Sequence, residues 1–586
     1  MWPFTSKFPA VHAKDVGGLS DPTFDFIVVG GGSAGCCLAS RLSEDPNVTV
    51  LLLERGPVAD DWPAHVPLLS ASPYRVGAPL VKLPSLPMPE VDGRVNTSFI
   101  GEGLGGGSLV NAMLYTRGIS DYNQWKENGR KNWGYNDLVP YFIKSENTLS
   151  QPVSNFRGKK GTWINQSFPK PVFGISPRFD DAATSLGIPY SSDFNSPDSP
   201  ATCCALMDVA IDSKMHRNST FTAFLSPEIV RTRQNLTICV EAVVNGIKCA
   251  TVEGSTKPRA LGVYFGDAKD SSHTFYAHAT REVVLCAGAV ASPQILMLSG
   301  IGPKAHLASH GIPLIKDLPG VGSYLKDHLG IPVMFKVPLK DSLNIMRASI
   351  FRAILEILKY LIFGTSLLAV PFVQTSIFVR SALLNEAMEI PSVTPAELDA
   401  RDPKNAPDIE IMPIPARASQ DPEGPIDRLG VFSMLAAVVR PKSFGTIRLA
   451  SPDPRTRAEI NLGYLTNPDD LPIARKAVRL SLRLAKQMRA RGYPLVDLAV
   501  PQGADDASVD AFIRKGIHTT YHYTSTCRMA PEDDAQPGVV DDELKIHGVD
   551  GLRVADCSSF PDIVCVHPMA PAVVVAEKCA DFLKKW

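Results

Sequence analysis

The sequence lacks any block of like charges, and its 59 lysine and arginine residues are balanced by 60 aspartate and glutamate residues among 586 residues. This balance excludes the basic surface that nucleic acid requires, so no nucleic-acid partner is expected. The N-terminus has no apolar run of about 7–15 residues after a basic start, which argues against a secretory signal peptide. We therefore expect an intracellular protein, cytoplasmic in location.

Long hydrophobic runs are also missing. The most apolar stretch, residues 353–372, is interrupted by Glu356, Lys359, Gly364 and Pro371, which leaves no uninterrupted span of ~20 residues. We expect no stable membrane insertion and predict a buried helix followed by a loop. A wall of an apolar substrate pocket and a surface that touches lipid stay open as alternatives for this stretch.

Motifs for disulfides and metal are absent as well. The 11 cysteines are odd in number and include no CxxC pair, which favours reduced thiols in an intracellular protein. His518 and His522 stand four residues apart, but the segment HTTYH lacks the glutamate of a HExxH zinc site. No metal is expected.

What the sequence does contain is a glycine-rich turn between a strand and a helix. Residues 24–30 form a short apolar run typical of a buried parallel strand, and GGGSAG follows at 30–35. Gly30 permits the tight turn, Gly32 lets the backbone approach a pyrophosphate, and Gly35 allows close helix–strand packing. A second apolar strand ends in Glu54, whose carboxylate can accept hydrogen bonds from ribose hydroxyls. A dinucleotide site is predicted here, with contacts from Gly30, Gly32, Ser33, Ala34, Gly35, Glu54 and Arg55.

The turn alone does not separate FAD from NAD, and a glycine-rich turn without a ligand is the plain alternative. Further motifs carry a more specific resemblance. They are GEGLGGGSLVNAMLYTRG at 101–118 with DYNQW at 121–125, GAVASPQILMLSGIG at 288–302, LPGVG at 318–322 with Asp327-His328, YHYTSTCRM at 521–529 and LRVADCSSFP at 552–561. Together they resemble the signatures of the glucose–methanol–choline (GMC) oxidoreductases, from about residue 24 to the C-terminus.

The resemblance implies FAD as the cofactor. It implies cofactor contacts from Gly107, Ser108, Asn111, Ala112, Met113, Leu114, Val244, Ala287, Asp556, Cys557, Pro568 and Met569. Some relatives carry a flavin-linking histidine just before the residue that matches Asn111. Val110 occupies that place here, so the FAD is expected to be non-covalent. The last helix, which follows Pro568, is expected to direct its N-terminus at the flavin.

Alcohol oxidation needs a base that can accept the hydroxyl proton near neutral pH, which suits histidine. Spacing alone does not bring His522 and His567 together, because 45 residues separate them. Through the resemblance they match the catalytic pair of the family, with His522 as base and His567 hydrogen-bonding the alkoxide. His518 and His328 are interpreted as structural residues.

The segments that match the family are scattered, so the fold class is α/β with interleaved domains. We predict a Rossmann-like FAD-binding domain from 1–150, 210–330 and 520–586, and a substrate-binding domain from 151–209 and 331–519. The substrate-binding domain is expected to hold an antiparallel sheet with helices behind it. Within it, strands are predicted at 407–413 and at 445–449 paired with 457–461, and a helix at 472–490.

The leading hypothesis is FAD-dependent oxidation of a small-molecule alcohol to a carbonyl, by an oxidase or a dehydrogenase. Dioxygen or a quinone would act as electron acceptor. The apolar 345–372 segment mildly favours an aryl, aliphatic or secondary-metabolite alcohol over a sugar. The alternatives are a non-redox cyclase or isomerase that keeps FAD as a scaffold, a photodecarboxylase, which the histidine pair argues against, and a flavin-binding protein without activity.

Overall fold

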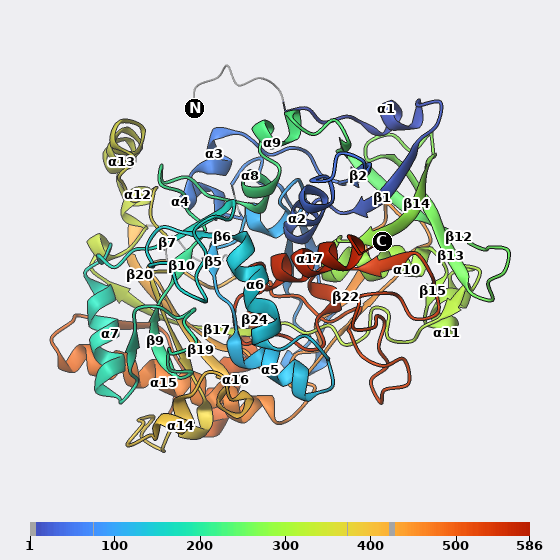
Figure 1. The fold of residues 1–586 in the computed structure, drawn as a ribbon. Coiled ribbons are helices and arrows are strands. Elements are labelled where there is room, and N and C mark those ends of the chain that lie inside the picture. Colours follow the sequence, from blue (N-terminus) through green and yellow to red (C-terminus); the bar gives the residue numbers. More distant parts are fainter. Residues whose placement is uncertain (1–7, 74, 372, 421–427, 586) are drawn as a thin grey trace.

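The computed structural model describes residues 8–585, apart from residues 74, 372 and 421–427. Two sheets occupy opposite sides of the molecule (Figure 1). One contains β1 (Thr23–Val29) and the other contains β20 (Gly430–Val438). The C-terminal helix α17 (Met569–Leu583) lies in the middle, with its N-terminus toward the space between them. This arrangement places both sheets around one site.

The first sheet has a parallel core extended by antiparallel strands. Its order is β11 (Leu236–Cys239), β2 (Val50–Leu53), β1, β14 (Phe275–Leu285), β13 (Pro258–Asp267) and β12 (Ala242–Thr251), and β25 (Leu552–Val554) also pairs with β14. The pairs β11–β2, β2–β1, β1–β14 and β14–β25 are parallel. Strands from three distant parts of the chain therefore end at the same edge of the sheet.

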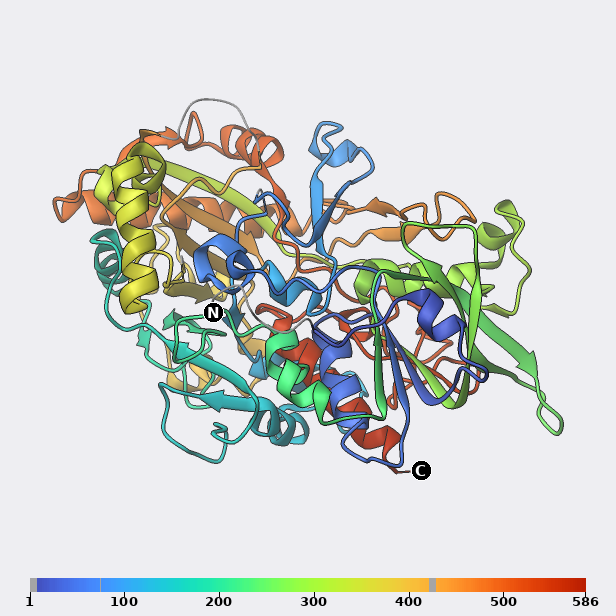
Figure 2. The ribbon, with the colours of Figure 1, turned by 90° about the horizontal axis from the view of Figure 1, so that it is seen from above.

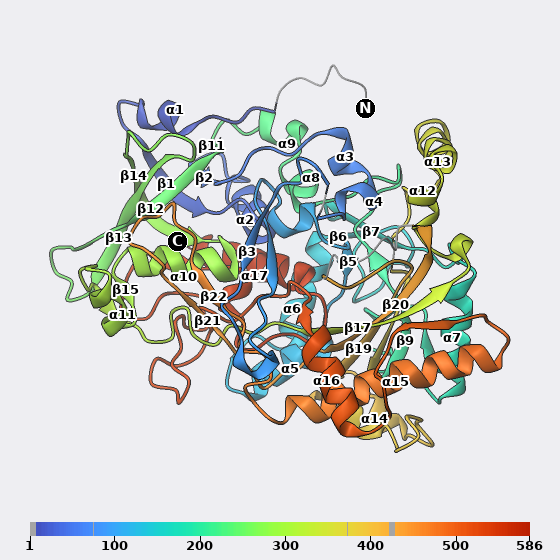
Figure 3. The same cartoon turned by 180° about the vertical axis from the view of Figure 1, so that it is seen from behind.

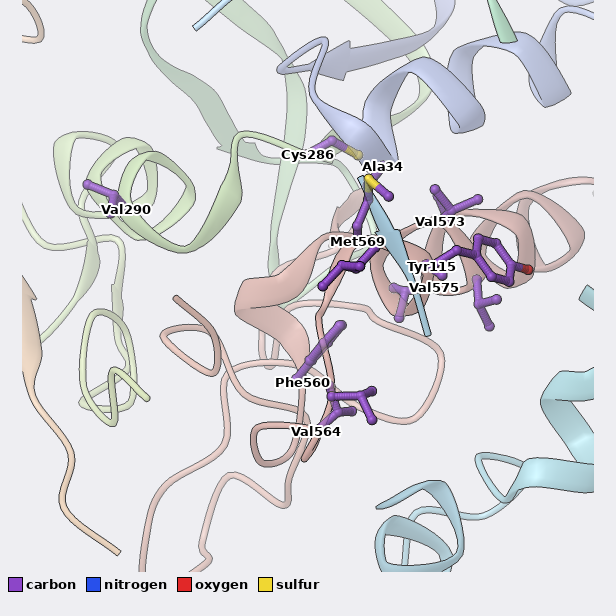
Figure 4. Close-up of a cluster of buried hydrophobic side chains, with 14 of the residues drawn as sticks. Ala34, Tyr115, Cys286, Val290, Phe560, Val564, Met569, Val573 and Val575 are labelled. Carbon is purple, nitrogen blue, oxygen red and sulfur yellow. The ribbon is translucent and has the colours of Figure 1, made fainter. Parts of the chain in front are cut away.

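Burial explains why these segments form a parallel sheet. All four residues of β2 are buried, as are the last four of β1, which suits strands covered on both faces. Helix α2 (Ser33–Leu42) follows β1 and packs against α17. Figure 4 shows Ala34 of α2, Cys286 just after β14 and Met569 of α17 close together in the core. This packing holds the start of α2 beside the start of α17.

The second sheet is antiparallel along most of its length. Its order is β23 (Val496–Ala499), β17 (Leu329–Val337), β20, β19 (Ile409–Ile414), β18 (Thr375–Val379), β9 (Cys203–Leu206) and β8 (Tyr190–Ser191), and β24 (His518–Thr519) also pairs with β17. Helices α15 (Asp470–Ala490) and α7 (Ile175–Ser185) cover its outer face (Figures 1 and 3). The predicted α/β fold class, with an antiparallel sheet and helices behind it, is confirmed.

Individual predictions in this half also hold. The strand expected at 407–413 is β19, and the helix expected at 472–490 is α15. The predicted hairpin is formed by β21 (Thr446–Arg448) and β22 (Glu459–Asn461), which pair antiparallel. Side chains alternate along β19, so Glu410, Met412 and Ile414 share the inner face of the sheet. That face lines the functional cavity described below.

The prediction of a buried helix within residues 353–372 is wrong. Helix α13 (Ile350–Phe363) lies at the margin of the molecule in views from the front and from behind (Figures 1 and 3), and in the view from above it lies on the side that faces the viewer (Figure 2). Its two buried residues are Glu356 and Tyr360, so the apolar residues face outward. Sequence hydrophobicity misleads here because the face that packs on the protein is the polar one. Glu356 can be buried on that face because Arg352 and Lys359 neutralise its charge. No helix in the described part of the chain is long and apolar enough to cross a membrane.

Candidate active site

A cavity of about 580 Å³ is lined by residues of both sheets. The first sheet and its turns contribute residues such as Gly30 and Glu54, and the second sheet contributes Met412, Ile414 and Leu435. This volume lies within the range of about 300–1,000 Å³ typical of cofactor and small-molecule sites. The cavity is therefore large enough to hold the cofactor predicted from the sequence.

The glycine-rich turn after β1 has the shape that a dinucleotide requires. Gly30 has a φ of +101°, and a Cβ there would lie 2.6 Å from the Cα of Ala287. A Cβ on Gly35 would lie 1.8 Å from the carbonyl oxygen of Gly30. At Gly32 an added Cβ would meet no other atom closer than 3.8 Å, and at Gly107 none within 4 Å. Gly32 and Gly107 thus leave open a cradle beside the N-terminus of α2, as a pyrophosphate requires.

Glu54, at the end of β2, lines the cavity and is only 7% exposed. Its Oε2 accepts a hydrogen bond of 2.7 Å from the N–H of Gly31, and its Oε1 accepts one of 2.7 Å from the N–H of Gly56. Each carboxylate oxygen keeps a second acceptor position, which can receive a ribose hydroxyl. Burial raises the pKa of Glu54, while the two backbone donors favour its charged form.

Asp556 follows β25 and joins it to the start of α10 (Gly288–Leu298). Its Oδ2 accepts hydrogen bonds from the N–H of Gly288 at 2.8 Å and from the hydroxyl of Ser292 at 2.6 Å. Its Oδ1 accepts one from the N–H of Ser558 at 2.7 Å, and burial raises the pKa of Asp556. The acid therefore ties two turns together at the cavity wall, where the resemblance implies the ribityl and pyrophosphate groups.

The start of α17 forms another part of the wall. Pro568 is its N-cap residue, and Pro568, Met569 and Ala572 line the cavity. The first N–H groups of a helix have no intrahelical acceptor, and they carry a partial positive charge. An anionic ring system bound in the cavity would be stabilised at this end of the helix.

Asn111 is held in place by a residue that sequence reasoning missed. Arg217 is 1% exposed, and its Nη1 donates to the Oδ1 of Asn111 at 2.9 Å and to the carbonyl oxygen of Ser108 at 2.8 Å. Burial lowers the pKa of Arg217 to about 9. No motif contains Arg217, because its role depends on the return of the chain to the loop at 105–111.

Most of the residues predicted to contact the cofactor line the cavity. They are Gly30, Gly32, Ser33, Ala34, Glu54, Arg55, Gly107, Asn111, Ala112, Leu114, Val244, Ala287, Asp556, Cys557, Pro568 and Met569. The cavity lining does not include Gly35, Ser108 or Met113. Gly35 packs on Gly30, the Ser108 hydroxyl bonds to the carbonyl oxygen of Gly105 at 2.7 Å, and Met113 is buried with a φ of +64°. These three residues shape the wall from behind it.

The two predicted catalytic histidines meet on the cavity wall. His522 follows β24, and its backbone N–H donates to the Oδ1 of Asp327 at 2.9 Å. His567 precedes α17, and its backbone N–H donates to the hydroxyl of Thr116 at 3.1 Å. The Nε2 of His522 lies 3.2 Å from the Nδ1 of His567, and both residues line the cavity. Backbone anchors on each side therefore set the distance between the rings.

A third histidine fixes the orientation of the first. The Nε2 of His328 lies 2.9 Å from the carbonyl oxygen of Val564, so this nitrogen carries the hydrogen. Burial lowers the pKa of His328 to about 4, so its ring is neutral and its Nδ1 is an acceptor. That Nδ1 lies 2.9 Å from the Nδ1 of His522, which must therefore donate. The Nε2 of His522 is left as the acceptor toward the cavity.

The electrostatic surroundings keep this acceptor free of a proton. Burial, together with His567 and His328, holds the pKa of His522 well below its usual value. The contact between His522 and His567 needs one hydrogen, which then belongs to the Nδ1 of His567. The Nε2 of His567 lies 3.1 Å from Oε1 of Glu410, which can accept its hydrogen. The arrangement pairs a neutral base with a hydrogen-bond donor.

Glu410 is the second residue that sequence reasoning missed. It is fully buried on β19, and its Oε1 also accepts a hydrogen bond of 2.8 Å from the hydroxyl of Ser376. A buried carboxylate is costly unless it has such partners. The alternation of β19 places Glu410 on the inner face, but the sequence gives no sign that His567 lies there.

The two histidines interpreted as structural differ in their relation to the pair. His518, interpreted as structural, is buried on β24, and its Nδ1 bonds to the carbonyl oxygen of Thr519 at 2.8 Å, although the residue also lines the cavity. His328 was assigned to the scaffold, whereas its ring centroid lies 4.8 Å from that of His522. Among the described residues, no group of three or more His, Cys, Asp or Glu side chains is arranged to hold a metal ion.

Comparisons with known proteins identify the family of the chain. Family models for GMC oxidoreductases match residues 24–330 and 441–576. The chain is 33% identical to "Dehydrogenase str4" of Strobilurus tenacellus, over 96% of this chain and 94% of that protein. It is also 33% identical to the oxygen-dependent choline dehydrogenase of Burkholderia cenocepacia, over 96% of this chain and 93% of that protein.

Solved structures show the same relationship. The pyridoxine 4-oxidase from Mesorbium loti has a TM-score of 0.80 at 26% identity, covering 96% of this chain and 99% of that one. A fungal aryl-alcohol oxidase has a TM-score of 0.81 at 25% identity, covering 97% and 99%. The resemblance and the FAD cofactor predicted from the motifs are confirmed. The chain belongs to the GMC oxidoreductase family, the FAD-dependent oxidases and dehydrogenases that act on CH–OH donors.

Proposed function

We propose that this enzyme oxidises an apolar alcohol to a carbonyl compound, with His522 as the base and His567 as the hydrogen-bond donor to the substrate oxygen. The observation that carries the proposal is the pair of ring nitrogens, Nε2 of His522 and Nδ1 of His567, which lie 3.2 Å apart on the wall of the cavity. A hydroxyl group beside both nitrogens could give its proton to one and accept a hydrogen bond from the other.

The reaction removes a proton from oxygen and a hydride from the adjacent carbon. Bound FAD would supply the hydride acceptor, held by the glycine cradle at Gly32 and Gly107, by Glu54 and Asp556, and by the start of α17. The hydroxyl proton would pass to Nε2 of His522, whose Nδ1–H stays bonded to His328. His567 would donate to the developing alkoxide, a contact that strengthens as negative charge grows on the oxygen.

Glu410 has a supporting role in this mechanism. With hydrogens on both nitrogens the ring of His567 would carry positive charge, which strengthens its hydrogen bond to the alkoxide and which the carboxylate 3.1 Å away would stabilise. Because Glu410 is fully buried, the low local dielectric makes this interaction stronger than it would be in water. Glu410 would thus position His567 and balance its charge without touching the substrate.

The walls near the histidines support an aryl, aliphatic or secondary-metabolite alcohol. Met412, Ile414, Leu435 and Val373 line the cavity on the side of the second sheet. Phe99 and Tyr521 also line it, and their ring centroids lie 5.2 Å apart. Such walls bind hydrocarbon or aromatic groups and leave few partners for the many hydroxyls of a sugar. The match to an aryl-alcohol oxidase supports the same choice.

The test is anaerobic reduction of the purified holoenzyme by a panel of alcohols, followed by addition of dioxygen or a quinone. We expect benzylic or aliphatic alcohols to bleach the flavin absorbance and to yield the corresponding aldehyde or ketone, and sugars to leave it unchanged. The acceptor that restores the absorbance faster distinguishes an oxidase from a dehydrogenase. Turnover of a substrate to an isomer without any bleaching would instead identify a non-redox enzyme that keeps FAD as a scaffold.

A further inference from the structure

Helix α13 exposes an apolar surface that the site does not use. Two adjacent stripes run along it at helical spacing, one of Ile350, Ile354, Ile357 and Leu361, and one of Phe351, Leu355, Leu358 and Ile362. Exposed fractions reach 83% at Phe351, 71% at Ile350 and 66% at Ile362. Monomeric proteins rarely expose contiguous apolar patches of this kind unless they mark an interaction site.

The polar side of the same helix faces the protein. Glu356 is 2% exposed, and its carboxylate lies 2.9 Å from Arg352 Nη2 and accepts a hydrogen bond of 2.9 Å from the N–H of Leu367. The hydroxyl of Tyr360 donates to the carbonyl oxygen of Met215 at 3.1 Å. The helix is thus fixed by its polar residues, with its apolar face directed away from the body of the protein.

Both ends of α13 are defined by local chemistry. The hydroxyl of Ser349 accepts a hydrogen bond from the N–H of Arg352 at the N-terminus, and Gly364 ends the helix with a φ of +64°. The segment that follows the helix is attached to the protein, because Leu68 donates its N–H to the carbonyl oxygen of Leu368 at 3.1 Å. The apolar face therefore belongs to a capped, anchored helix, and its 14 residues are too few to span a bilayer.

The charges around this face select its partner. The one acid on the helix is buried and neutralised, whereas the side chains of Arg352 and Lys359 are 40% and 41% exposed. Arg347, just before the helix, is also exposed. A second copy of the chain would bring like charges together across a two-fold axis. An anionic lipid surface would meet apolar and cationic groups at once, as interfacial helices require.

We propose that α13 is a membrane-docking helix that inserts its apolar face into the interface of a bilayer containing anionic lipids. Phe351 and Ile362 would enter the boundary between headgroups and acyl chains, while Arg352 and Lys359 would contact the phosphates. This proposal concerns the surface alone, and it stands or falls independently of the reaction proposed above.

The test is flotation of the FAD-loaded enzyme with vesicles of phosphatidylcholine alone or of an equimolar mixture with phosphatidylglycerol. We expect the wild-type enzyme to float, more completely with the anionic mixture. The double variant Phe351→Glu, Ile362→Glu should bind the anionic vesicles at least about 10-fold more weakly than the wild type, because two inserted side chains become charged. Its flavin absorbance would show that it remains folded.

A matched control introduces the same charges elsewhere. Leu19 and Val153 are 50% and 73% exposed in loops, and the variant Leu19→Glu, Val153→Glu should float like the wild type. As a second readout, Phe351→Trp should shift its fluorescence to the blue when anionic vesicles are added. Wild-type enzyme that stays in solution with both vesicle types would overturn the proposal. So would a wild-type dimer that the Phe351→Glu, Ile362→Glu variant converts to a monomer.

Discussion

The two walls of the cavity are built in different ways. On the side of the first sheet, the lining comes from short continuous segments, such as the turn after β1 and the loop that contains Gly107. On the side of the second sheet, it comes from single residues such as Met412 and Ile414, separated by others that face away. The wall on the side of the first sheet is formed by contiguous motifs, and the wall on the side of the second sheet depends on strand register.

The difference teaches where each kind of information resides. A pyrophosphate needs bare backbone and helix N–H groups, which only a few local sequences can provide. An apolar wall needs only suitable volume at alternate positions, and many sequences meet that requirement. The histidine pair combines the two cases. His522 lies in a motif and His567 lies shortly after one, while their partners Glu410 and His328 come from the second sheet or its edge.

The largest expected effect comes from removing the base at the junction of the walls. His522→Ala should lower the rate of anaerobic flavin reduction by roughly 10²-fold or more, because its Nε2 is the proposed acceptor of the hydroxyl proton. FAD should stay bound, since the cradle is untouched. The matched control is His273→Ala, at an exposed position, which should reduce at the wild-type rate. Unchanged reduction in His522→Ala would show that another base serves.

A smaller effect is expected when the motif wall alone is altered. Gly32→Ala places a methyl group in the cradle, and we expect FAD affinity to fall by about 10- to 100-fold from steric overlap with the cofactor. Gly516→Ala is the control, because an added Cβ there meets no atom closer than 3.7 Å outside its own helix and Gly516 does not line the cavity. Equal FAD titration curves for the two variants would contradict a pyrophosphate at Gly32.

Next in size is a change on the wall of the second sheet that leaves FAD binding intact. Glu410→Gln keeps the shape of the side chain but removes the charge beside His567. We expect flavin reduction to slow on the order of 10-fold, less than for His522→Ala, because only the stabilisation of His567 is weakened. Stopped-flow reduction at saturating alcohol measures this effect. A wild-type rate would show that the carboxylate has only a structural role.

The smallest expected effect is a displacement of the pH profile. Only neutral His522 can accept the hydroxyl proton, and burial lowers its pKa, so the neutral form persists to lower pH. The acidic limb of kcat/KM should therefore lie below pH ~6.5, the usual value for histidine. Anaerobic reduction measured at low alcohol concentration across the pH range checks this expectation. An acidic limb above that value would assign the base to a different group.

Much of this protein can be predicted from sequence because its motifs are local. The turn itself requires glycine at position 30, through its φ of +101°, and at position 35, where a Cβ would meet the carbonyl oxygen of Gly30. The burial of β2 follows from four apolar residues in a row. The hairpin of β21 and β22 and the helix α15 are likewise set by neighbouring residues. Such features require no knowledge of the rest of the chain.

Other features were decided by tertiary structure alone. Glu410 lies 157 residues from His567, and His328 lies 194 residues from His522, so only the packing of the second sheet against α17 and β24 brings them together. The outward direction of α13 was also undetermined, because the salt bridges of Glu356 form only in the folded chain. Sequence specified the chemical groups, and long-range packing decided their partners and which of them face solvent.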